Sequence, residues 1–268
     1  MAFAQSTRPI PGAVATLGVS DRVTFLRKTY AHLTVALIGF ALVTGGMLRF
    51  TPETSFSFSR WALTGRWNWF LVLGLFMLTG YVADRLARSD TSRGLQYLGL
   101  AIAVVAEGIL LQPMMWLVMA KFGDVTTQMA IGAGLMGHTE AIRNTVMGGL
   151  AGKIILESVG ITLTIFIGLS ATVFISKKDF SFMRGALTVA TFGALAVIVC
   201  SMIFGFQLGA IFSGLMIILM AGYILYQTSQ VMSHFPPSGY VAASLMLFST
   251  IATLFWYVLR LMMEMNRR

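Results

Sequence analysis

The sequence predicts an all-α integral membrane protein that forms a bundle of seven transmembrane helices. Of its 268 residues, 57% are hydrophobic and only 11% are charged, whereas soluble domains keep about 25% of their residues charged. The mean hydropathy is +0.80, and apolar stretches of about 20 residues, the length that crosses the hydrocarbon core, recur along the chain. These observations leave no room for a separate soluble domain.

The apolar stretches are expected to be helices, because lipid offers no partners to unpaired backbone groups. The predicted spans are, in chain order, residues 29–48, 69–87, 94–120, 154–175, 185–204, 207–232 and 240–263. Pro113 predicts a bend in the third span, Gly205 begins a tight joint between the fifth and sixth, and Pro236 helps to end the sixth. The chain therefore divides into three parts, which are an N-terminal cytoplasmic tail (1–28), a transmembrane domain (29–263) and a short basic tail (264–268).

The orientation follows from the positive-inside rule. Arg27 and Lys28 precede the first span, Arg85 and Arg88 end the second, and a pair of lysines follows the fourth. This pattern favours a cytoplasmic N-terminus. The first span has no small-residue cleavage site after it, which predicts a retained helix. No organelle retention signal closes the chain, so a bacterial inner (plasma) membrane is the expected location.

A long loop, residues 121–153, separates the third and fourth spans. It is rich in Gly and Met, and residues 132–137 match G-x-G-x-x-G in letters. The match follows no strand and lies in no βαβ unit, so a dinucleotide site is not expected. An interfacial or re-entrant loop is the favoured interpretation.

Ionisable residues inside a membrane are costly and usually face the bundle interior or a wet cavity. Glu107 lies near the middle of the third span and Glu157 near the start of the fourth. Both are candidate pore positions. The structural alternatives are a protonated or hydrogen-bonded contact for Glu107 and a position at the membrane edge for Glu157.

The seventh span carries a polar stripe. Thr250, Thr253 and Tyr257 are spaced i, i+3 and i+7, and Arg260 and Glu264 continue the stripe as an i, i+4 pair. Such a stripe indicates a helix side turned away from lipid. The alternative is that the hydroxyls bond their own backbone four residues back.

The chain offers no catalytic constellation, so it is not expected to be an enzyme or to hold a cofactor. Three isolated histidines make a metal site improbable, and a single cysteine, Cys200, excludes an intrachain disulfide. The net charge of +9 comes without a nucleic-acid-binding motif, which indicates contact with lipid headgroups and no nucleic-acid partner.

Several segments, in order, resemble the Bax inhibitor-1 family (transmembrane Bax inhibitor motif proteins). They are Phe-Leu-Arg-Lys-Thr-Tyr at 25–30, Gly-Ile-Leu-Leu-Gln-Pro at 108–113, Lys-Lys-Asp-Phe-Ser-Phe at 177–182, Gly-Tyr-Ile-Leu-Tyr at 222–226, Leu-Phe at 254–255 and Leu-Arg-Leu at 259–261. The resemblance implies a compact seven-helix bundle with the last helix at its centre. It also implies a pH-sensitive calcium leak channel, protection against cell death, or association with a membrane protease.

The resemblance implies that the leak depends on one aspartate in each of the last two helices and on an arginine at the end of the second transmembrane helix. In this chain the aspartate positions fall on Gln227 and Thr250, while Arg85, or alternatively Arg88, matches the arginine. Gln and Thr do not titrate, so carboxylates sharing a proton cannot set the pH response at these two positions.

Three functions remain open. The first is an ion or calcium leak channel that uses Glu107 or Glu157, or that lacks pH gating. The second is a non-conducting partner of a membrane protease or another membrane protein, or of a stress response. The third is a small-solute transporter, against which the lack of a visible inverted repeat argues.

Overall fold

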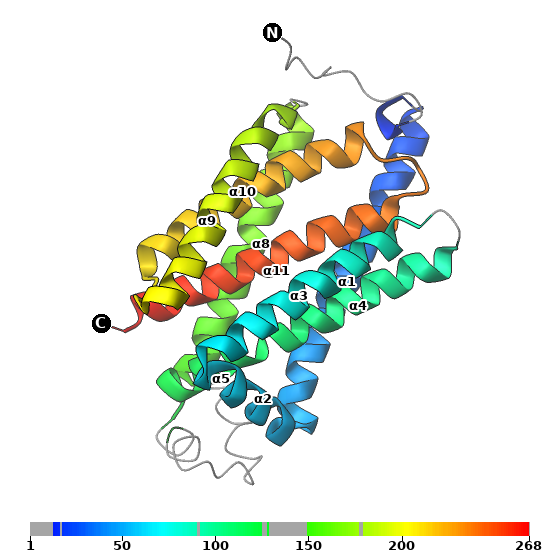
Figure 1. Ribbon diagram of the computed structural model, residues 1–268. Helices are drawn as coiled ribbons and strands as arrows, with labels where there is room; N and C mark the ends of the chain where they lie inside the picture. The colour runs from blue at the N-terminus through cyan, green and yellow to red at the C-terminus, as the bar shows by residue number, and fades with distance from the viewer. Residues whose placement is uncertain are drawn as a thin grey trace.

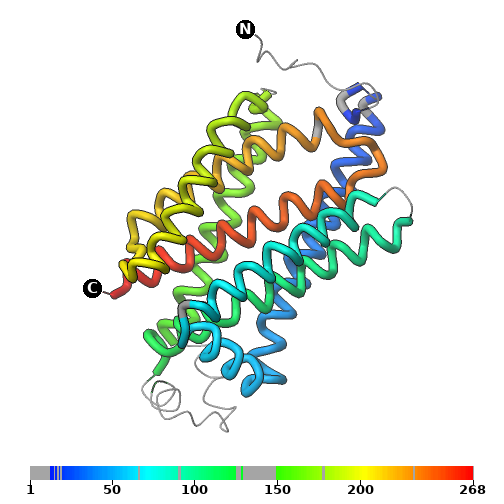
Figure 2. Tube along the Cα trace, viewed as in Figure 1, coloured from blue at the N-terminus to red at the C-terminus, as the bar shows by residue number. Residues whose placement is uncertain are grey.

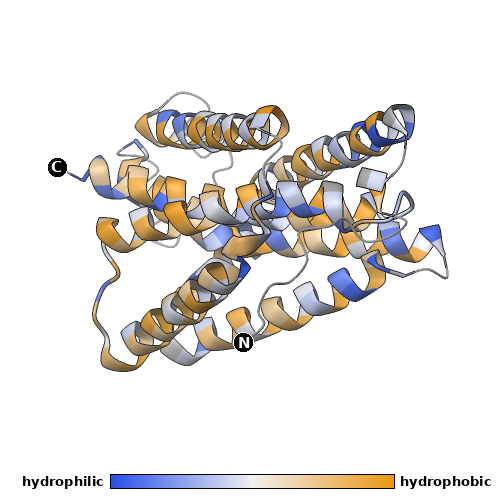
Figure 3. Ribbon diagram, turned by 90° about the horizontal axis from the view of Figure 1, so that it is seen from above, coloured by the Kyte–Doolittle hydropathy of each residue, from blue (hydrophilic) through white to orange (hydrophobic). Residues whose placement is uncertain are grey.

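The computed structural model describes residues 13–16, 18–89, 92–124, 128, 149–176 and 179–267. Within these residues seven helical segments are long and apolar enough to cross a membrane, and no strand occurs. Hydrophobic residues dominate the helices in Figure 3. The prediction of an all-helical, multi-pass membrane bundle is therefore confirmed.

The helices pack side by side (Figure 1). In chain order they are η1 (Val14–Thr16), α1 (Val19–Phe50), α2 (Pro52–Thr64), α3 (Arg66–Ala87), α4 (Arg93–Leu110), α5 (Gln112–Phe122), α8 (Leu150–Ser176), η2 (Ser181–Met183), α9 (Arg184–Phe204), α10 (Ala210–Ser233) and α11 (Tyr240–Met265).

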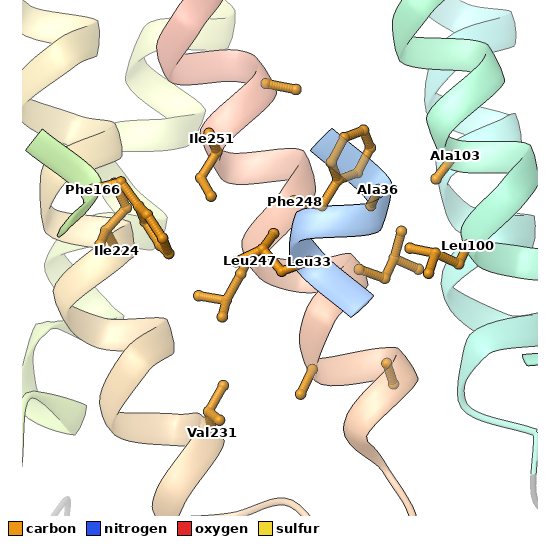
Figure 4. Packing of buried hydrophobic residues seen from close by; sticks show 14 of the residues in the cluster. Leu33, Ala36, Leu100, Ala103, Phe166, Ile224, Val231, Leu247, Phe248 and Ile251 are labelled. Carbon is orange, nitrogen blue, oxygen red and sulfur yellow. The ribbon is translucent and has the colours of Figure 1, made fainter. Parts of the chain in front are cut away.

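Helix α11 is the centre of the bundle. It packs against α10, α1, α8 and α4, and Figure 1 shows it between α9 and α10 on one side and α3 and α4 on the other. Its Leu247, Phe248 and Ile251 are almost fully buried and lie among side chains such as Leu33 of α1 and Ile224 of α10 (Figure 4). The central last helix that the resemblance implies is thus present in this chain.

The bundle has two ends, which are distinguished by the helices that begin and finish at each. Helix α1 begins at one end, and α11 finishes at the opposite end, as the blue and red parts of the tube in Figure 2 show. The end where α1 and α11 begin is called the N-end, and the other the C-end. Helices α3 and α10 finish at the N-end, so their last turns lie beside the first turns of α11.

The third span divides into α4 and α5 at Leu111, which keeps right-handed helical angles, so the two helices together remain one candidate span of 30 residues. Leu111 separates helix α4 from α5, and its N–H donates a hydrogen bond to Glu107 O at 3.0 Å. Pro113 has no N–H with which to continue the ladder, but it is well suited to the first turn of a new helix. The joint after α9 begins with Gly205 in the left-handed region at φ 76°, which a residue without Cβ adopts freely.

Helical structure extends beyond the predicted spans at two places. Residues 19–28, assigned to the tail, form the first turns of α1, because no helix breaker separates them from the span and Asp21 suits the positive end of the helix dipole. Residues 52–64 were left between spans but form α2, which begins with Pro52 and buries only one narrow face. Most of the 121–153 loop, including residues 132–137, lies outside the described residues.

Candidate functional site

Three cavities follow one another along one face of α11. The N-end cavity has a volume of about 490 Å³, the middle cavity about 350 Å³ and the C-end cavity about 590 Å³. Met246 lines both the N-end and the middle cavity, and Thr253 lines both the middle and the C-end cavity. The cavities are therefore neighbours, and the series extends from one end of the bundle to the other.

The middle cavity contains the two positions at which the family's aspartates are expected. Thr250 Oγ1 donates a hydrogen bond to Gln227 Oε1 at 2.8 Å, and both side chains are buried. The bond joins α10 to α11 and carries no charge. The structure thus brings Gln227 and Thr250 together, in a contact that does not respond to pH.

A carboxylate that the sequence analysis did not single out also lines the middle cavity. Asp84, in the last turn of α3, lies 2.8 Å from Arg88 Nε, and both side chains are about half exposed. Arg88 lines the N-end cavity, where its guanidinium lies 5.6 Å from the ring centroid of Phe235. The ion pair therefore connects the walls of two adjacent cavities.

Arg85 lies apart from this cluster. Its Nε donates to Tyr81 Oη at 3.1 Å on the exposed side of α3, and it lines none of the three cavities. Of the two arginines that matched the family's position, Arg88 is the one beside the cavities. Different partners separate the two guanidinium groups, because Tyr81 holds that of Arg85 and Asp84 holds that of Arg88.

Glu107 lines the C-end cavity one turn beyond Ala103, which lines the middle one. The residue is only 7% exposed. Its carboxyl group makes no hydrogen bond or ion pair with the described part of the chain, so the alternative of a bond from this group to a neighbouring helix finds no partner there. Glu157, by contrast, is exposed at the start of α8 and lies 3.7 Å from Lys153 Nζ. It lines none of the three cavities.

The polar stripe of α11 faces the cavities and also bonds its own backbone. Thr253 Oγ1 donates to Ser249 O at 2.8 Å, yet Thr253 lines two of the cavities. Arg260 and Glu264, which continue the stripe, both line the C-end cavity. Arg260 donates to the carbonyl of Leu208, which lies before α10, and Glu264 pairs with Arg267 at 3.4 Å.

Oxygen-bearing side chains line the middle and C-end cavities. Hydroxyl and amide oxygens line the middle cavity, Asp84 adds one carboxylate there and Glu107 another in the C-end cavity. Oxygen is the ligand that hard cations prefer. Among the described residues no three His, Cys, Asp or Glu side chains gather as a metal site would require.

This chain is similar to one family model and to several known proteins. The family model described as "Inhibitor of apoptosis-promoting Bax1" matches residues 126–268, more than half of the chain. The Bax inhibitor 1 of Schizosaccharomyces pombe is 29% identical over 93% of this chain and 79% of its own length. An uncharacterized Pseudomonas aeruginosa protein is 35% identical over 48% of this chain and 59% of its own length. Protein LIFEGUARD 3 of Arabidopsis thaliana is 33% identical over 43% of this chain and 49% of its own length.

The family match covers α8 to α11, which include both Gln227 and Thr250, and the yeast relative extends the similarity over most of the remaining spans. The chain belongs to the Bax inhibitor-1 family of membrane proteins.

Proposed function

We propose that this protein is an ion leak channel, with calcium as the candidate ion, and that the ion path follows the polar face of α11. The observation that supports the proposal is the series of three cavities, joined through Met246 and Thr253. A cation entering at either end meets oxygen-bearing side chains along the path. The family resemblance supports the same activity.

The gate of this channel differs from a pair of acids sharing a proton. Gln227 and Thr250 hold α10 to α11 by a neutral hydrogen bond, so opening requires that bond to break without any change of charge at these positions. Asp84 and Glu107 supply the negative charge that attracts a cation. Asp84 forms an ion pair with Arg88.

We also propose that the N-end is cytoplasmic and that the protein resides in a bacterial inner membrane. Arg27 and Lys28 in the early turns of α1 and Arg85 and Arg88 in the last turns of α3 lie at this end. A surplus of Lys and Arg beside the spans is typical of the cytoplasmic side.

A bulky side chain at the junction of two cavities tests the path directly. Thr253→Trp is expected to reduce calcium entry into dye-loaded proteoliposomes at least about fivefold, because the indole fills the space that the middle and C-end cavities share. Leu215→Trp is the matched control, since Leu215 is 60% exposed on the outer side of α10. Flux that equals that of empty liposomes for the wild type, or that survives Thr253→Trp, refutes the proposal.

The second candidate, a non-conducting partner of a membrane protease or of another membrane protein, is favoured by the neutral Gln227–Thr250 contact. A family member without the titrating pair keeps the fold but lacks the chemistry associated with the leak. The discriminating result is a wild type without flux, together with flux gained by Gln227→Asp/Thr250→Asp. In that case stable partners recovered from detergent extracts become the next measurement.

A further inference from the structure

We propose that the C-end cavity binds a small organic ammonium ion, for which Glu107 is the counter-ion. The binding itself does not depend on ion conduction, so the two proposals fail separately. The site is defined by Glu107, the aromatic residues Trp69, Trp256 and Tyr257, and the polar mouth at the C-end. Its volume of about 590 Å³ lies within the range of small-molecule sites.

The carboxyl group of Glu107 has no partner in the described part of the chain. The side chain is more than nine-tenths buried, lines the cavity, and has no hydrogen-bond or ion-pair partner in the described part of the chain. Burying a carboxylate without a partner is costly, and such groups in native structures usually have a functional explanation. A cationic ligand in the cavity would supply the counter-charge that the ionised form of this carboxyl group needs.

Aromatic rings form part of the wall of the C-end cavity. The rings of Trp69 on α3 and Trp256 on α11 stack with centroids 6.1 Å apart and an interplanar angle of 26°, and both side chains line the cavity. Tyr257 and Phe76 add two more rings. Tryptophan faces attract cations, and aromatic cages with a nearby acid are the usual recognition site for quaternary ammonium groups.

Other charged residues also line the C-end cavity. Arg260 lies seven residues beyond Thr253 on α11, about 10 Å toward the C-end at the helical rise per residue, and it is bonded to the Leu208 carbonyl. Arg267 is paired with Glu264, and Lys121 lies in the last turn of α5. The described lining of the cavity therefore holds one acid without a partner and several aromatic rings, beside two arginines that already have partners and Lys121. An organic cation suits this lining better than a metal ion, which needs several oxygen ligands.

The test uses choline and its uncharged carbon isostere, 3,3-dimethyl-1-butanol, on the full-length protein in detergent. The reaction of Glu107 with dicyclohexylcarbodiimide is followed by mass spectrometry. Saturating choline is expected to slow the labelling of Glu107 at least about fivefold, while the isostere leaves the rate unchanged. Equal protection by both compounds, or by neither, overturns the proposal.

A second readout is tryptophan fluorescence, because Trp69 and Trp256 form the cavity wall. Choline is expected to change the emission saturably in the wild type. Glu107→Gln, which keeps the size of the side chain and removes its charge, should weaken the affinity roughly tenfold or more, since a charge-assisted contact is lost. Glu157→Gln is the matched control, because Glu157 is exposed on α8 away from the cavity. An unchanged affinity in Glu107→Gln contradicts the assignment.

Discussion

Replacing Thr250 with valine is expected to raise the calcium leak by removing a single hydrogen bond inside the middle cavity. Valine keeps the branched shape of threonine and lacks only the hydroxyl that donates to Gln227 Oε1 at 2.8 Å. That bond joins α10 to α11. The bond from the same hydroxyl to Met246 O, at 3.2 Å, lies within α11 and does not hold two helices together.

The size of the effect follows from the value of the bond. Side-chain hydrogen bonds between helices in a membrane are worth about 0.6 kcal/mol on average and about 1.7 kcal/mol at most. If the bond holds the bundle in its closed arrangement, its loss raises the open population by roughly three- to eighteenfold. The initial rate of calcium entry should increase by the same factor while the open state remains the minor one.

The assay is calcium entry into dye-loaded proteoliposomes at matched protein content. Thr164→Val is the control, because Thr164 is exposed on α8 and its hydroxyl donates to Gly160 O of the same helix at 2.8 Å. A rate for Thr250→Val within twofold of the wild type would show that the bond does not restrain opening. An equal rise in Thr164→Val would show that any lost hydroxyl loosens the bundle.

Two further predictions concern packing and pH. Gly99→Ala should lower the free energy of unfolding by about 1–3 kcal/mol, because the new Cβ would lie 2.5 Å from the Ala83 carbonyl oxygen of α3; Gly74→Ala, where nothing lies within 4 Å, is the control in a thermal unfolding assay. Gln227→Asp/Thr250→Asp should make calcium flux differ more between pH 6 and pH 8 than in the wild type, because two carboxyls in contact share a proton. An unchanged pH profile contradicts this second expectation.

The spans were predictable because the bilayer fixes both their length and their composition. Helix α2 was not, because its sequence is too short and too polar to span lipid, and it forms by burying small residues such as Ser55 against α5. Ser55 Oγ donates to Gln112 Oε1 at 2.7 Å and accepts from Trp116 Nε1 at 2.8 Å. Such contacts between distant segments have no local signal in the sequence.

The candidate site was predictable only in part. The meeting of Gln227 and Thr250 could be expected from the family resemblance, since no spacing rule relates positions on two different helices. Asp84 was missed because charged residues at the end of a span were interpreted as signals of orientation. The burial of Glu107 follows from its place near the middle of a span, but its cavity depends on how α3, α9 and α11 pack and could not be derived from the third span alone.

The accessibility of α11 to water-soluble reagents tests the account most directly. In a Cys200→Ser background, Thr253→Cys in proteoliposomes is treated with a charged, membrane-impermeant methanethiosulfonate. Leu215→Cys serves as the lipid-facing control and Asn266→Cys, exposed beyond the end of α11, as the water-facing one. Thr253→Cys is expected to react and Leu215→Cys is not, because only thiolates in contact with water react. An unreactive Thr253→Cys beside a reactive Asn266→Cys would contradict an aqueous path along α11.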